Sequence, residues 1–196
     1  MINKISSHIL NFVSKHFDIS SEMRDIYQYG IEITLSSMLN IVLVLLCSLI
    51  MGSVWAGLIY LLVFIFLRSF TGGFHASTYF KCNLTMVITF IVTYCSYRII
   101  IFCDPPIFIY EMVILLNLIP IITCSPVPNK HKPLSNQQKD RSLNLSLIFA
   151  SVLSLIGLIC IVLNISIGAM IIMTITMVTV LIIIETFLQR GGYHEC

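Results

Sequence analysis

The chain alternates between long apolar runs and short polar segments, and this pattern predicts membrane-spanning helices. Six runs approach the length of about 20 residues that a helix needs to cross a hydrocarbon core about 30 Å thick. These runs are residues 31–51, 54–67, 84–102, 107–124, 143–163 and 167–184. The run at 54–67 is the shortest, and only Gly52 and Ser53 separate it from the run before it, so five spans are an alternative to six.

Composition supports the same class of fold. Of the 196 residues, 58% are hydrophobic and only 10% are charged, and the mean hydropathy is +0.98. A soluble domain has too little interior to hide so much apolar surface. We therefore expect an all-α integral membrane protein of about six transmembrane helices, surrounded by the lipid bilayer and without a nucleic-acid partner.

The first thirty residues differ from the rest because their apolar residues recur at helical spacing among polar ones. Lys4, His8 and Lys15 interrupt the segment, so it lacks the continuous apolar core of a cleavable signal peptide. The apolar positions are Ile2, Ile5, Ile9, Phe12, Val13 and Phe17. This pattern predicts an amphipathic helix that lies on the inner leaflet of the membrane. A second helix is expected to begin at Ser20 or Ser21, both good N-cap residues, and to lead into the first span.

The distribution of basic residues predicts the orientation of the chain, because cytoplasmic loops gather Lys and Arg. With six spans and a cytoplasmic N-terminus, all but Arg98 of the 11 Lys and Arg residues fall on the cytoplasmic side. Both termini and the segments 68–83 and 125–142 are then cytoplasmic. The predicted parts are an interfacial segment at 1–30, a membrane domain at 31–187 and a short tail at 188–196.

One polar connection carries most of the reactive residues. It reads R68-S-F-T-G-G-F-H-A-S-T-Y-F-K-C82. His75 can give and take protons near neutral pH, and Cys82 is a strong nucleophile once it is a thiolate. Lys81 and the start of a helix near Cys82 would both favour that thiolate.

Cooperation between His75 and Cys82 requires the chain to fold back between them. In a continuous helix, residues seven apart are separated by about 10.5 Å along the axis, whereas a base and its nucleophile need contact at about 3 Å. Gly72 and Gly73 permit the backbone angles of such a turn.

The helix that carries Cys82 is expected to begin just before it. Ser77 or Thr78 is suited to cap this helix, so that Cys82 lies in its first turn or two. Unpaired backbone N–H groups of the first turn would then lie near the sulfur. Such groups can bind the oxyanion of a tetrahedral intermediate in acyl transfer.

Other interpretations of these residues are less specific. Cysteines in membrane helices are usually small packing residues, and the seven cysteines here show no disulfide framework. A metal site built from His75, Cys82, Cys124 and His131 lacks the close paired spacing of zinc ligands. We expect neither a metal nor another cofactor.

The string R-x3-GG-x-H-x6-C resembles the accessory gene regulator B (AgrB) family, as do Y-x-Y-G-I-E at 27–32 and N-K-x-K-P at 129–133. The resemblance covers nearly the whole chain. It implies a cysteine endopeptidase of the bacterial cytoplasmic membrane that converts a small amphipathic pro-peptide into a cyclic thiolactone or lactone quorum-sensing pheromone. In this resemblance Cys82 is the nucleophile, His75 is its general base, and a homodimer fits the family. The unranked candidates for a third catalytic residue are Asn129, Ser125 and Glu32.

Charged residues near the connection suggest how a peptide is bound. Four basic residues lie in the segment 125–141, namely Lys130, Lys132, Lys139 and Arg141. They either attract an acidic peptide tail or only fix the topology. Arg68 either pairs with a substrate carboxylate or anchors its span by extending toward water. Glu185, at the end of the last span, is expected to meet cytoplasmic water.

Two other classes of protein compete with a peptidase. In a small multi-pass transporter or peptide exporter, His75 and Cys82 would be incidental, and polar residues would face one another at mid-membrane. The last two spans show only scattered Ser, Thr and Asn among aliphatic residues. A noncatalytic scaffold that binds a partner through its N-terminal helix would tolerate Cys82→Ser and His75→Ala.

Overall fold

The computed structural model describes residues 2–14, 21–72, 78–127 and 135–190. These residues form seven α-helices and no strand, which confirms the expected all-α class. The helices are α1 (Ile2–Ser14), α2 (Ser21–Ile50), α3 (Val54–Thr71), α4 (Tyr79–Cys103), α5 (Ile107–Cys124), α6 (Asn136–Val162) and α7 (Ile167–Arg190).

Six of these helices, α2 to α7, are long and apolar enough to cross a membrane. They coincide with the six predicted runs. Helix α3 is 18 residues long, so even the shortest run forms a helix of spanning length, and six spans are confirmed over five by length and composition. Helix α2 is continuous from Ser21 to Ile50, so the expected second N-terminal helix and the first span are one helix.

Helix α7 lies at the centre of the bundle. It contacts α3, α4, α5 and α6, and its residues Ile172, Ile175 and Ile182 are almost fully buried. Helices α6 and α7 approach each other so closely at Gly157 and Gly168 that a Cβ on Gly168 would collide with the backbone of Gly157. Small residues at such a crossing let two membrane helices pack backbone to backbone.

Helix α2 packs against α3 and α4, and α1 packs against α2. Ser6 and Leu10 of α1 are buried, whereas Ile5 and Phe12 are exposed. Leu10 therefore packs inward, while Ile5 and Phe12 leave an outward apolar surface on α1 that suits a helix that meets lipid. Its position on the inner leaflet remains a prediction.

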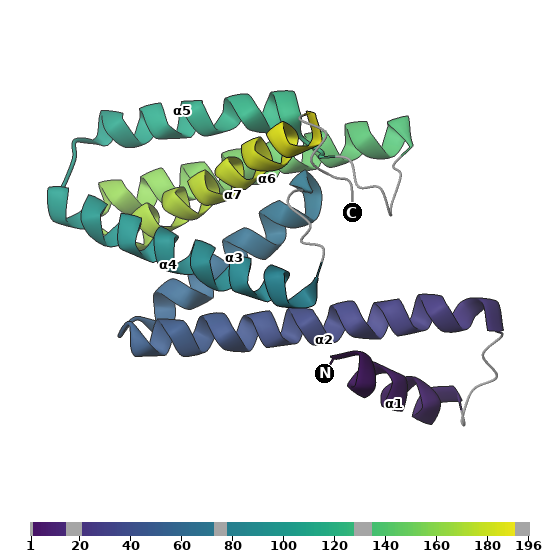
Figure 1. The fold of residues 1–196 in the computed structure, drawn as a ribbon. Helices are drawn as coiled ribbons and strands as arrows, with labels where there is room; N and C mark the ends of the chain where they lie inside the picture. The colour runs from purple at the N-terminus through teal and green to yellow at the C-terminus, as the bar shows by residue number, and fades with distance from the viewer. Residues whose placement is uncertain (1, 15–20, 73–77, 128–134, 191–196) are drawn as a thin grey trace.

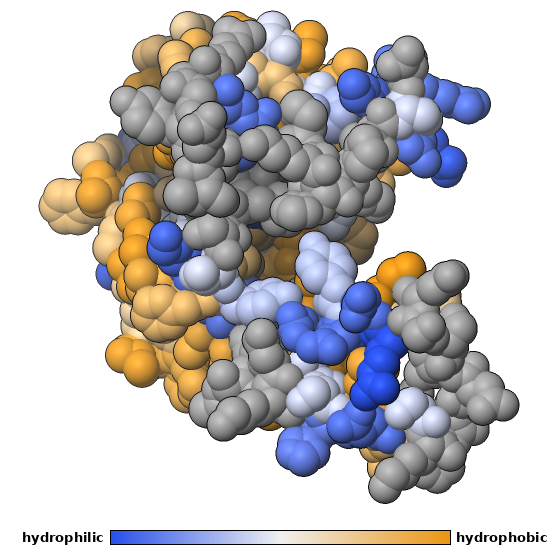
Figure 2. Space-filling model, turned by 45° about the vertical axis from the view of Figure 1, so that its right-hand side comes forward, coloured by the Kyte–Doolittle hydropathy of each residue, from blue (hydrophilic) through white to orange (hydrophobic). Residues whose placement is uncertain are grey.

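The helix ends that flank the predicted polar segments lie at one side of the molecule. The starts of α2, α4 and α6 and the ends of α3, α5 and α7 all lie toward the right of Figure 1. Figure 2 shows a hollow on this side, with apolar surface at its back and polar residues along its lower rim. Of the described candidate residues, Arg68, Cys82 and Ser125 lie at these helix ends. The cytoplasmic orientation of this side remains a prediction.

Candidate active site

Cys82 lies in the first turn of α4. Thr78 is the N-cap of this helix, and its hydroxyl oxygen accepts a hydrogen bond from the N–H of Lys81 at 3.3 Å. The N–H of Cys82 donates to the carbonyl oxygen of Thr78 at 3.0 Å. The expected helix start just before Cys82, with Thr78 as its cap, is therefore confirmed. The Cys82 side chain is half-buried.

The backbone N–H groups around the sulfur are partly used by the helix itself. Those of Lys81 and Cys82 are engaged with Thr78, so neither is available to an oxyanion. Tyr79 and Phe80 come first in α4, where backbone N–H groups have no acceptor within the helix. The expected set of unpaired donors near Cys82 is thus reduced to these two positions.

Helix α2 holds this first turn from one side. The hydroxyl of Tyr79 donates to Oε2 of Glu32 at 2.8 Å, and the hydroxyl of Ser36 donates to Oδ1 of Asn83 at 2.9 Å. Glu32 and Ser36 are four residues apart and share one face of α2. The contacts therefore fix α4 on both sides of Cys82 along the chain.

Arg68 brings positive charge to Cys82 from the last turn of α3. Its guanidinium interacts electrostatically with Cys82 of α4 and with Glu185 of α7, and it lies over the ring of Phe64, 5.4 Å from the ring centre. Helix α3 thus brings a cation into the neighbourhood of Cys82.

Glu185 is not where the sequence suggested. We expected it to meet cytoplasmic water, but its side chain is only 3% exposed. It accepts a hydrogen bond from Gln189 at 3.0 Å and interacts electrostatically with Arg68. The prediction was wrong because α7 is the central helix, so the end of its span is covered by neighbouring helices.

Gly72 follows directly after α3 and lies against Val127 in the segment 125–142. Its φ of 68° and ψ of −150° lie in a region open almost only to glycine, and a Cβ there would lie 2.9 Å from the carbonyl oxygen of Val127. The N–H of Val127 donates to the carbonyl oxygen of Thr71 at 3.0 Å. Ser125 is buried beside these residues, with its hydroxyl 3.4 Å from the carbonyl oxygen of Thr71 and 3.5 Å from the Ser146 hydroxyl. The two polar segments therefore begin in contact.

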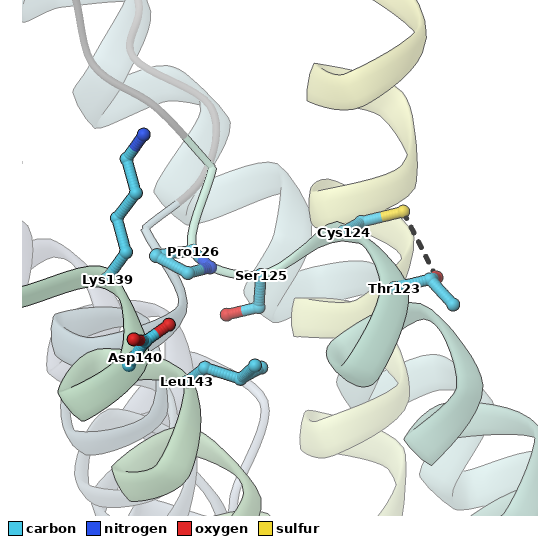
Figure 3. A pocket seen from close by; sticks show the side chains of 7 residues that line it. All are labelled: Thr123, Cys124, Ser125, Pro126, Lys139, Asp140 and Leu143. Carbon is cyan, nitrogen blue, oxygen red and sulfur yellow. Dashed lines mark hydrogen bonds between the residues drawn. The ribbon is translucent and has the colours of Figure 1, made fainter. Parts of the chain in front are cut away.

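A pocket of about 270 Å³ lies between the end of α5 and the start of α6. Figure 3 shows Lys139 and Asp140 of α6 on one side of it and Ser125 on the other, whereas the sulfur of Cys124 points away toward Thr123. Lys139 and Arg141 are both exposed in the first turns of α6. Of the basic residues proposed to bind a peptide tail, Lys139 lines this pocket.

Several predicted site residues lie outside the described part of the chain. These are His75, Gly73, Asn129, Lys130 and Lys132. The pairing of His75 with Cys82 therefore remains a prediction. Of the candidates for a third catalytic residue, Glu32 is engaged by Tyr79 and Ser125 by the end of α3.

The polar contacts between α2 and α4 were missed by sequence reasoning. Their signal is a stripe of polar residues at helical spacing in the first half of α2, formed by Gln28, Glu32 and Ser36. Tyr79 and Asn83 form a second such pair in α4. Polar residues four apart in an apolar helix indicate a face turned toward polar partners.

The family model of accessory gene regulator B matches residues 6–185. The chain belongs to the accessory gene regulator B family. The match begins in α1 and ends near the end of α7, so it covers all the described residues of the candidate site up to Glu185.

Curated relatives in this family come from Clostridium perfringens. "Putative AgrB-like protein" of strain SM101 is 26% identical over 151 residues, which is 72% of this chain and 68% of that protein. "Putative AgrB-like protein 1" of strain 13 is 24% identical over 159 residues, which is 81% of this chain and 83% of that protein. No solved structure matches the chain. An accessory gene regulator B protein with six helices of spanning length is a multi-pass membrane protein, and its family is one of peptide processing.

Proposed function

We propose that this chain is a membrane-embedded cysteine endopeptidase that cleaves a small amphipathic pro-peptide and promotes its cyclisation to a thiolactone or lactone quorum-sensing pheromone. The proposal is supported by Cys82 in the first turn of α4, in electrostatic interaction with Arg68, in a member of the accessory gene regulator B family. A partly exposed cysteine at a helix start with a cation in its neighbourhood is in a setting typical of reactive cysteines.

In the first step, the Cys82 thiolate attacks a backbone carbonyl of the pro-peptide. His75 acts as general base for the thiol and then protonates the departing amine. The C–N bond breaks, the C-terminal tail leaves as a free amine, and the N-terminal part remains as a thioester on Cys82. N–H groups at the start of α4 stabilise the oxyanion of the intermediate.

In the second step, the thiol or hydroxyl of a cysteine or serine within the bound peptide attacks the thioester carbonyl and gives its proton to His75. The bond to Cys82 breaks, the ring closes, and Cys82 leaves as a thiolate. Exchange of one thioester for another is nearly neutral in bond energy, so closure depends on proximity and on keeping water away from the acyl-enzyme. The apolar wall of the hollow in Figure 2 supports such exclusion.

The substrate is held at the cytoplasmic face of a bacterial cell membrane by its own amphipathic helix. Its acidic tail is drawn to the basic residues at the start of α6, Lys139 and Arg141, together with Lys130 and Lys132. A homodimer completes the proposed assembly, because membrane helices with exposed apolar faces can bury them by pairing.

The test is cleavage of the pro-peptide encoded nearest this gene, co-expressed with wild type, Cys82→Ala, Cys82→Ser or His75→Ala. Mass spectrometry reads the released tail, and Cys160→Ser serves as the matched cysteine control. We expect no tail from the Cys82→Ala or His75→Ala variants at normal membrane abundance, and wild-type amounts from Cys160→Ser. Tail release by Cys82→Ala would end the peptidase assignment and favour a transporter or exporter.

A further inference from the structure

Glu32 is a buried carboxylate that joins three helices. Its side chain is 8% exposed. Oε1 accepts hydrogen bonds from Ser6 of α1 at 3.0 Å and Gln28 of α2 at 3.2 Å, and Oε2 accepts one from Tyr79 of α4 at 2.8 Å. A buried carboxylate is costly unless it is fully hydrogen-bonded. Both oxygens are engaged, so the carboxylate is held in one orientation.

The bond from Tyr79 reaches the turn that carries Cys82. Tyr79 is the first residue of α4, three positions before Cys82. On the other side of Cys82, Asn83 accepts a hydrogen bond from Ser36 of α2. A rotation or shift of the start of α4 would have to break these bonds, so α2 sets where the sulfur points.

Helix α1 is the third partner in this network. Ser6 is fully buried and donates directly to Glu32, while the apolar residues Ile5 and Phe12 on the outer side of α1 remain exposed. An outward apolar face suits a helix that rests on a membrane surface. Displacement of α1 would remove one of the donors that orient the carboxylate holding Tyr79.

We propose that Glu32 is a positioning residue that fixes the Cys82 turn and ties its geometry to the docking of α1. It acts through Tyr79 and touches neither the substrate nor the reacting atoms. This inference rests on the proposed peptidase function for its effect on turnover, but the geometry of the Cys82 turn can be measured without any substrate.

The experiment compares Tyr79→Phe, which removes only the hydroxyl that reaches Glu32, with Ser6→Ala, which removes only the donor from α1. Asn11→Ala is the matched control, because Asn11 joins α1 to Arg24 of α2 without reaching Glu32. Each variant is reconstituted in vesicles. The first readout is kcat and KM for tail release, and the second is the alkylation rate of Cys82 by N-ethylmaleimide when Cys82 is the sole cysteine.

We expect Tyr79→Phe to lower kcat about tenfold with little change in KM, because a displaced nucleophile loses its attack geometry. Ser6→Ala should lower kcat by about threefold in the same way. Both should change the alkylation rate of Cys82, while Asn11→Ala leaves both readouts as in wild type. The double variant Tyr79→Phe with Glu32→Gln should have a kcat only slightly below that of Tyr79→Phe alone, because both changes break the same hydrogen bond between Tyr79 and Glu32.

An unchanged kcat and alkylation rate in Tyr79→Phe would overturn the proposal. Equal effects of Ser6→Ala and Asn11→Ala would also overturn it, since docking of α1 would then matter without the Glu32 contact. Failure of the peptidase assignment looks different. In that case Cys82→Ala still releases the tail, and the alkylation rates alone decide whether Glu32 positions the turn.

Discussion

Cys82 and Cys124 are half-buried cysteines on the same side of the molecule, at opposite ends of their helices. Cys82 lies in the first turn of α4, where the helix dipole is positive, and Arg68 adds its charge. Cys124 is the last residue of α5, where the dipole is negative, and its sulfur lies 3.4 Å from the hydroxyl of Thr123. Two cysteines of similar burial therefore differ in the electrostatics of their helix ends, and on this difference we expect Cys82, and not Cys124, to act as the nucleophile.

Replacing each of the two cysteines by alanine in turn should give the largest difference in tail release. Cys82→Ala should lower tail release by at least about 10³-fold, because the covalent step is lost. Cys124→Ala should leave it as in wild type. Tail release is quantified by mass spectrometry at matched membrane abundance. A comparable loss in both variants would remove the distinction between the two helix ends.

Removal of the charge beside Cys82 should have the next largest effect. Arg68→Met is expected to lower kcat about 10²-fold, the usual cost of losing one electrostatic stabiliser in a site. Arg68→Lys keeps a charge and should recover part of the rate. The measurement is single-turnover tail release in vesicles.

Arg68→Met also removes the positive charge that interacts with the buried side chain of Glu185. The double variant Arg68→Met with Glu185→Gln removes that buried charge and should recover abundance but not rate. Recovery of the rate as well would show that Arg68 acts on folding alone.

The fold could be predicted from sequence largely because membrane crossing demands long apolar helices. The six runs were enough to place α2 to α7, and the Ser and Thr before Cys82 indicated the helix start. Contacts between helices were not predictable, because apolar periodicity does not say which faces meet. Glu185 was misplaced for this reason, and the hydrogen bonds of Glu32 were missed although its polar stripe was visible.

The contact between the end of α3 and Val127 gives a third prediction. Gly72→Ala combines a positive φ with a Cβ placed 2.9 Å from the Val127 carbonyl oxygen, and it should lower the free energy of unfolding by about 3 kcal/mol. Gly52→Ala has a similar φ of +75° but no atom within 4 Å, so it should cost only about 1 kcal/mol. Unfolding in mixed micelles measures both. Equal costs would mean that the contact at Val127 does not hold the two polar segments together.

A substitution in the pocket beside Ser125 is expected to have the smallest effect on turnover. Lys139→Ala should raise KM for the pro-peptide by about threefold and leave kcat unchanged, because an exposed charge contributes mainly to attraction. The effect should fade at high salt. A change in kcat instead would place Lys139 closer to the chemistry than its exposure indicates.

Trapping of the acyl-enzyme would show whether Cys82 carries the acyl group. The pro-peptide is mixed with protein in vesicles and quenched in acid, and the peptide that contains Cys82 is analysed by mass spectrometry. We expect a mass increase on Cys82 equal to the N-terminal part of the pro-peptide, which hydroxylamine removes and which is absent from Cys82→Ala. Tail release without any adduct on Cys82, or with the adduct on another residue, would contradict it.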